Sequence, residues 1–167
     1  MKRFIDREQE MDTLQNEYNR EGSALVVMYG RRRVGKTTLI SEFIKDKHAL
    51  FFLASEESET QNRTVFKEKA ADFINSDLLR NADVKRWDVI FKAIMDAPHP
   101  SKPVIVLDEF QYLGKSNPAF PSIFQRIWEE LLKKRSVMVI LCGSLISMME
   151  SQKLDYSSPL YGRSTAK

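Results

Sequence analysis

The residues with the clearest chemical pattern form a glycine-containing segment, residues 30–37, with the sequence GRRRVGKT. It matches the phosphate-loop pattern G-x-x-x-x-G-K-[ST], in which glycines allow a tight turn that points backbone N–H groups at a β-phosphate. The ammonium group of Lys36 can reach the β- and γ-phosphates, and the hydroxyl of Thr37 suits Mg²⁺. A chance glycine-rich turn is the alternative, but an apolar run precedes the loop and a helical pattern follows it, as phosphate binding requires. The predicted nucleotide-binding residues are Gly30, Arg31, Arg32, Arg33, Val34, Gly35, Lys36, Thr37 and Thr38.

A second chemical signal is a pair of acids that follows the apolar run at residues 104–107. Such a run places Asp108 and Glu109 at the carboxyl edge of a parallel sheet, where folds of this kind bind ligands. Asp108 is predicted to hold Mg²⁺, usually through water, and Glu109 to orient and deprotonate an attacking water. A helix cap or a solvated turn is the alternative for an acid pair after a strand, and the phosphate loop favours the metal and base roles.

Ser144 follows another apolar run, residues 137–142. Its hydroxyl is predicted to hydrogen-bond a γ-phosphate or the attacking water, and the alternative is an N-cap for the segment after it. Cys142 is interpreted as a small core residue.

The three consecutive arginines of the loop, Arg31 to Arg33, occupy variable positions of the phosphate-loop pattern. Their side chains are expected either to pair with acids such as Asp108, Glu109 or Glu8, or to contact a nucleic acid or an acidic partner.

These residues need strands and helices that hold them in place, and hydrophobic periodicity predicts such elements. Apolar runs predict strands at residues 24–29, 49–54, 104–108 and 137–141, with a loop at 55–61. Helical spacing predicts helices at 37–44, 65–79, around 87–94 and at 119–134, and a first helix capped by Asp6. Apolar strands that alternate with helices predict an α/β fold with a parallel sheet covered by helices on both faces.

Length and composition fit a single globular domain. The chain has 167 residues, 43% of them hydrophobic and 29% charged, and a formal net charge of +3, which is too small to predict nucleic-acid binding by itself. One cysteine excludes an intramolecular disulfide, and two histidines make a histidine-based metal site a poor hypothesis. The apolar runs are far shorter than the ~20 residues of a membrane span. We therefore expect a cytoplasmic protein that does not cross a membrane.

Several of these motifs together resemble the prokaryotic P-loop ATPases of the archaeal ATPase type, which are related to the AAA+ and STAND proteins. The resemblance rests on residues 4–8, 29–38, 107–113, 141–144 and 158–163. It implies a three-layer fold of the additional-strand class with the strand order 5-1-4-3-2, and it implies a sensor role for Ser144. It also implies that Arg163 reaches the γ-phosphate of a neighbouring subunit, and a surface or structural arginine is the alternative.

The function that follows is binding of Mg-ATP and its hydrolysis to ADP and phosphate, in a nucleotide-driven switch or motor core. The alternative is a nucleotide-dependent module that binds DNA or a protein and hydrolyses little ATP. A GTPase is disfavoured because the sequence has no Asn-Lys-x-Asp or Thr-Lys-x-Asp segment, and a kinase because Glu109 suits water activation. DNA, a protein and a second copy of the chain are the expected partners.

The sequence also yields an expectation about completeness. Only four strands are predicted, so the fifth strand of the additional-strand class is expected to be missing and the first strand to lie at a sheet edge. Relatives carry a small helical or winged-helix segment after this core. We therefore expect residues 1–167 to be one ATPase domain of a longer protein, with weak ATP affinity, low turnover and a tendency to self-associate.

Overall fold

The fold is an α/β sandwich built on a parallel sheet, in a computed structural model that describes residues 2–30 and 35–144. Residues 1, 31–34 and 145–167 lie outside the described part. The strands are β1 (Ala24–Gly30), β2 (Ala49–Leu53), β3 (Val104–Asp108) and β4 (Met138–Ser144). Their order is β1-β4-β3-β2, and every neighbouring pair is parallel. This confirms the predicted fold class and the 1-4-3-2 part of the predicted strand order.

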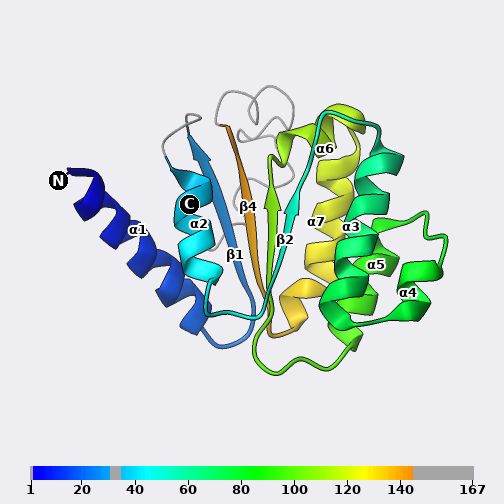
Figure 1. The fold of residues 1–167 in the computed structure, drawn as a ribbon, viewed down its shortest axis with the longest axis horizontal. Coiled ribbons are helices and arrows are strands. Elements are labelled where there is room, and N and C mark those ends of the chain that lie inside the picture. Colours follow the sequence, from blue (N-terminus) through cyan, green and yellow to red (C-terminus); the bar gives the residue numbers. More distant parts are fainter. Residues whose placement is uncertain (1, 31–34, 145–167) are drawn as a thin grey trace.

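Helices cover both faces of the sheet (Figure 1). On one face lie α1 (Lys2–Asn19) and α2 (Lys36–Ile44), and on the other lie α3 (Glu59–Ile74), α5 (Trp87–Asp96) and α7 (Phe120–Glu130). Two short helices, α4 (Asp77–Asn81) and α6 (Gln111–Ser116), connect the longer ones, and a 3₁₀ turn, Leu132–Lys134, follows α7. Among the described residues, no helix is long and apolar enough to span a membrane.

Each strand contributes side chains to two separate cores, because successive residues of a strand point to opposite faces. In β3, Ile105 and Leu107 belong to the core under α3, α5 and α7, whereas Val104 and Val106 belong to the core under α1 and α2. All five residues of β3 are buried, as expected for a central strand of a parallel sheet. The sheet is therefore a rigid platform whose carboxyl edge carries the predicted site residues.

Several helix boundaries differ from the sequence-based prediction. The predicted loop at 55–61 is shorter, because the Ser58 hydroxyl accepts a hydrogen bond from Gln61 N and α3 begins at Glu59. The predicted helix at 65–79 is interrupted at Asn75, which has a φ of 55°, and Ser76 then caps α4. Asp6 is not an N-cap, because α1 begins four residues earlier.

Two further differences concern the elements around β3 and β4. Helix α6 was not predicted, and the helix predicted over 119–134 ends at Glu130, after which the chain tightens into the 3₁₀ turn. The described residues contain four strands, and the segment after Ser144, to which the prediction of a missing fifth strand refers, lies outside the described part.

Candidate nucleotide site

The carboxyl ends of β1, β4 and β3 lie side by side, and the predicted site residues follow them. Gly30 is paired with Ser144 at the ends of β1 and β4, and Leu107 of β3 is paired with Leu141 of β4. Helix α2 begins at Lys36 directly after Gly35, whose φ of 78° lies in the left-handed region that favours glycine. The sheet register and this glycine therefore bring the start of α2 to the acids after β3.

Lys36 lies across the end of β4. Its Nζ donates a hydrogen bond to the Gly143 carbonyl oxygen at 2.8 Å, and the side chain is only partly buried. The ammonium group is thus held at the sheet edge by a backbone acceptor of the neighbouring strand. A phosphate oxygen is a stronger acceptor for this cation than a neutral carbonyl, so the contact can be exchanged for a ligand.

Thr37 and Asp108 bring two oxygen ligands together. Thr37 Oγ1 donates to Asp108 Oδ2 at 3.3 Å, while Asp108 Oδ1 accepts a hydrogen bond from Glu109 N at 2.8 Å. Asp108 is 3% exposed. Mg²⁺ is commonly bound through one or two protein oxygens plus substrate phosphates and waters, so this hydroxyl–carboxylate pair fits that ion. No cluster of three or more His, Cys, Asp or Glu side chains that could hold a metal ion occurs within the described ranges.

Glu109 has an unusual backbone conformation. Its φ is 54°, in the left-handed region that non-glycine residues rarely adopt and that is common at functional sites. Its Oε2 accepts a hydrogen bond from Gln111 Nε2 at 2.9 Å, and the next residue, Phe110, donates its backbone N–H to the Cys142 carbonyl at 3.0 Å. These contacts fix the turn after β3 against β4 and place a second carboxylate directly beside Asp108.

Cys142 lies in the same region but is enclosed. It is fully buried in the core under α1 and α2, as predicted. Burial raises the pKa of its thiol well above the ordinary value, and the negative charge of Asp108 adds to that effect. A thiol held in its neutral form is a poor nucleophile, so this cysteine contributes packing to the site.

Comparison with known proteins places the chain in a family. The family described as an ATPase domain predominantly from Archaea matches residues 4–166. The chain belongs to this ATPase family. An uncharacterized protein of Methanocaldococcus jannaschii is 36% identical over 162 residues, which are 97% of this chain and 34% of that protein.

Solved structures show the same fold as the ATPase domain. The Walker-type ATPase of Pyrococcus abyssi superposes with a TM-score of 0.61 at 20% identity, over 93% of this chain and 50% of that one. The Drosophila ORC bound to DNA superposes with a TM-score of 0.57 at 12% identity, over 87% of this chain and 39% of that one. The ATPase domain thus spans about a third of the Methanocaldococcus protein, half of the Pyrococcus chain and 39% of the Drosophila chain.

Five predicted site residues of the ATPase domain fall in the segments 31–34 and 145–167. Arg31, Arg32, Arg33, Val34 and Arg163 lie outside the described residues, so the pairing of the arginines with Asp108, Glu109 or Glu8 and the role of Arg163 stay predictions.

Two other predicted site residues, Ser144 and Thr38, lie at the end of β4 and in the first turn of α2. Ser144 ends β4 beside Gly30, but its side chain is not among those described, and its sensor role also stays a prediction. Thr38 is exposed in the first turn of α2.

Gln111 is a site residue that sequence reasoning missed. It is 2% exposed at the start of α6 and donates to the carboxylate of Glu109. The signal was an amide two residues after the second acid, in the segment DEFQ. Its meaning depends on the left-handed backbone at Glu109, which no pattern of apolar residues reveals.

Proposed function

We propose that the domain binds Mg-ATP at the carboxyl edge of β1, β4 and β3 and hydrolyses it to ADP and phosphate. The observation that carries this proposal is the convergence of Lys36, Thr37 and Asp108, from α2 and β3, with Glu109 beside them. Membership of an ATPase family supports the same reading. The hydrolysis cycle would act as a nucleotide-driven switch or motor core.

In this proposal the N-terminal end of α2 receives the phosphates. Backbone N–H groups of the loop and the positive end of the helix bind the β-phosphate, and Lys36 leaves the Gly143 carbonyl to contact the β- and γ-phosphates. Thr37 and Asp108 would hold Mg²⁺, with Asp108 acting directly or through water. Bound Mg²⁺ neutralises the charge that develops on the β- and γ-phosphate oxygens.

Glu109 is proposed as the general base. Its carboxylate would orient a water in line with the γ-phosphate. As the water oxygen bonds to the γ-phosphorus and the P–O bond to ADP breaks, Glu109 would accept a proton from the water, giving ADP and phosphate. Gln111 donates to one carboxylate oxygen of Glu109 and so orients the proposed base. Ser144 and Arg163 are proposed to contact the γ-phosphate, Ser144 from the same chain and Arg163 from a neighbouring copy.

The partners of the cycle are also proposals. The fold shared with the Drosophila ORC bound to DNA favours testing DNA, and the proposed role of Arg163 requires a homo-oligomer. Phosphate release measured with and without duplex DNA, over a range of protein concentrations, tests both. Rates that rise more than linearly with protein concentration indicate an active assembly, and rates strictly proportional to concentration contradict it.

The central experiment measures phosphate release from ATP and GTP with Mg²⁺ and with EDTA. We expect Mg²⁺-dependent release from ATP that Lys36→Ala abolishes, with an unchanged far-UV spectrum and melting transition. Near-normal activity of a folded Lys36→Ala protein would overturn the site assignment. Tight ATP binding without phosphate release would support the binding-site assignment but contradict the hydrolytic function.

A further inference from the structure

A separate cavity lies on the opposite side of the sheet from α1 and α2, between α3, α5 and α7. Its volume is about 530 Å³, within the range of sites that hold a small ligand or a few side chains. Residues of α3, of the segment that leads into α5 and of α7 line it, so three elements far apart in the sequence form its walls. The predicted nucleotide-site residues are not among its lining residues.

The floor of this cavity is apolar. Trp87 and Ile127 are each 3% exposed, and the partly buried side chains of Ile123 and Leu131 continue the same surface. The indole N–H of Trp87 is buried and has no hydrogen-bond partner within the described ranges.

The rim of the cavity carries a surplus of unpaired positive charge. Three of its basic residues have acidic partners: Arg63 pairs with Glu59, Arg86 with Asp88, and Lys92 with Asp96. By contrast, Lys85 and Arg126 are exposed, line the cavity and have no ion pair within residues 2–30 and 35–144. Among the acids that line the cavity, only Glu130 also has no ion pair within those ranges. A carboxylate placed between Lys85 and Arg126 would gain two charge-assisted contacts.

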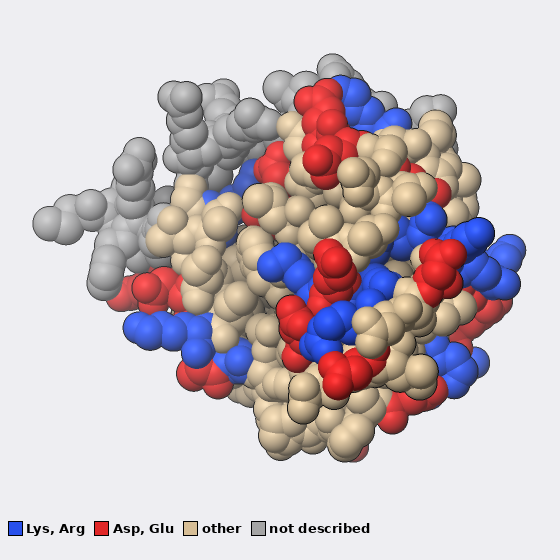
Figure 2. All heavy atoms as spheres, turned by 45° about the vertical axis from the view of Figure 1, so that its right-hand side comes forward, with Lys and Arg blue, Asp and Glu red and all other residues tan. Residues whose placement is uncertain are grey.

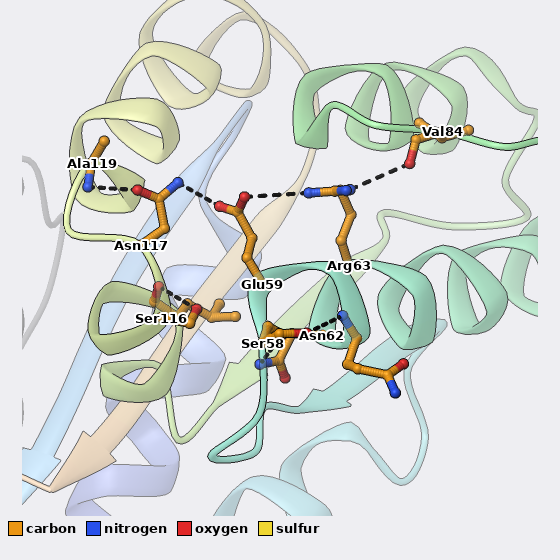
Figure 3. A network of polar contacts seen from close by, with 10 residues as sticks. Ser58, Glu59, Asn62, Arg63, Val84, Ser116, Asn117 and Ala119 are labelled. Atoms are coloured by element: carbon orange, nitrogen blue, oxygen red, sulfur yellow. Dashed lines mark hydrogen bonds and ion pairs between the residues drawn. The ribbon is translucent and has the colours of Figure 1, made fainter.

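The walls are held in place by a polar network (Figure 3). Glu59 accepts hydrogen bonds from Asn117 Nδ2 and, at 3.3 Å, from Arg63 Nη1. Arg63 Nε donates in turn to the Val84 carbonyl at 3.3 Å, and Asn117 Oδ1 accepts from Ala119 N at 3.0 Å. The network joins α3 to the two segments that precede α5 and α7. The cavity is therefore pre-formed, which lowers the entropic cost of binding.

We propose that this cavity is a docking site for a short segment of a partner protein that carries a carboxylate next to an apolar side chain. The apolar side chain rests on Trp87 and Ile127, and the carboxylate lies between Lys85 and Arg126. A nucleic acid fits less well, because its phosphate backbone needs an extended basic surface. Figure 2 shows acidic and basic side chains mixed over the α3, α4 and α5 side, without the continuous basic stripe that such a backbone needs.

The test uses fluorescein-labelled decapeptides and the full 167-residue chain, with binding followed by fluorescence anisotropy. One peptide contains two glutamates beside a leucine, a second has lysines in place of the glutamates, and a third has serine in place of the leucine. We expect saturable binding of the first peptide only. Lys85→Glu and Arg126→Glu should each weaken it by at least about tenfold. The matched control is Lys134→Glu, the same charge change at an exposed residue outside the cavity, and it should change the affinity less than about twofold.

The fluorescence of Trp87 gives a second, independent measurement of peptide binding. Trp128 is buried and does not line the cavity, so a Trp128→Phe protein reports the cavity through Trp87 fluorescence alone. The acidic peptide should shift that emission in a saturable way, and the lysine peptide should leave it unchanged.

Four results would overturn the proposal. The first is no saturable binding of the acidic peptide, and the second is an equal loss of affinity with Lys134→Glu. The third is displacement by N-acetylglutamate at the peptide's own concentration, which indicates a small organic acid as the ligand. The fourth is displacement by single-stranded DNA at that concentration, which indicates a nucleic acid.

Discussion

Polar residues at the two ends of the sheet are bonded in different ways. At the carboxyl end, Lys36 donates to the Gly143 carbonyl and Glu109 accepts from the side-chain amide of Gln111, and a ligand can replace these contacts. At the amino end, Lys102 donates to the carbonyls of both Tyr18 and Arg20, and a chain of hydrogen bonds runs from His48 through His99 to the Ile94 carbonyl.

The two ends therefore serve different purposes. At the amino end the bonds tie separate elements to one another and stabilise the fold. At the carboxyl end Lys36 and Glu109 lie at the edge where parallel sheets bind ligands, and they are available for chemistry. If the distinction holds, substitutions at the carboxyl end should lower ATP turnover, and substitutions at the amino end should lower the free energy of unfolding.

The largest effect is expected for Glu109→Gln. The amide keeps the shape of the side chain but cannot accept the proton, so ATP turnover should fall by roughly 10²–10⁴-fold while ATP binding persists. Phosphate release and filter binding of labelled ATP measure the two quantities separately. Glu68→Gln, the same change on the exposed surface of α3, is the control and should have normal activity. Normal turnover of Glu109→Gln would make Glu109 a structural acid.

The second prediction concerns the amino end. Lys102→Met keeps most of the side-chain length but removes the bonds to the carbonyls of Tyr18, in α1, and of Arg20, just after it, so the free energy of unfolding should fall by about 1–3 kcal/mol. The turnover number should stay unchanged. Urea denaturation measures the loss, and Lys134→Met, at an exposed position, should cost nothing comparable. A loss of activity at unchanged stability would contradict the division between the two ends.

A smaller effect is expected for Gln111→Met, which keeps the buried volume but removes the donor to Glu109. Because Gln111 only positions the base, kcat should fall by roughly tenfold or less with KM unchanged. The decisive measurement is the double variant with Glu109→Gln, in which the second substitution should have no further effect on kcat. Additive losses would show that Gln111 acts independently of Glu109.

The smallest effect is a pH dependence from the histidine pair. Burial lowers the pKa of His48, and the neighbouring His99 lowers it further, so the neutral ring is favoured in the folded state. The stability from the pair is complete above the ordinary histidine pKa of about 6.5 and is lost as the pH falls through the lower folded-state value. We expect the melting temperature to drop between pH 7.5 and pH 5, and the drop to be smaller in His48→Asn. Equal drops in both proteins would exclude the pair as the cause.

Much of the fold could be predicted because buried parallel strands are continuous apolar runs. The strands β1 and β3 were predicted for that reason. The positions of Lys36, after β1, and Asp108, at the end of β3, were predicted from these two strands. Helix ends were less readable, since single residues such as Asn75, in its left-handed conformation, decide them.

Contacts between distant segments were not readable at all. Tyr18 and Lys102 are 84 residues apart, and the bond between them depends on how α1 packs beside the start of β3. The contact between Glu109 and Gln111 is local, yet it needs a backbone conformation that residue type alone does not indicate.

The buried thiol of Cys142 can report when the sheet opens around β4. It is the only cysteine in the sequence, it sits in the strand between β1 and β3, and burial keeps it protonated. An alkylating reagent reacts with thiolates, so modification of the native protein must wait until β4 separates from its neighbours. A nucleotide bound as proposed, between the loop after β1 and the acids after β3, would lower the open population by the factor 1 + [L]/Kd. The rate of alkylation, followed by the mass of the intact chain, would therefore measure how firmly nucleotide locks the centre of the sheet.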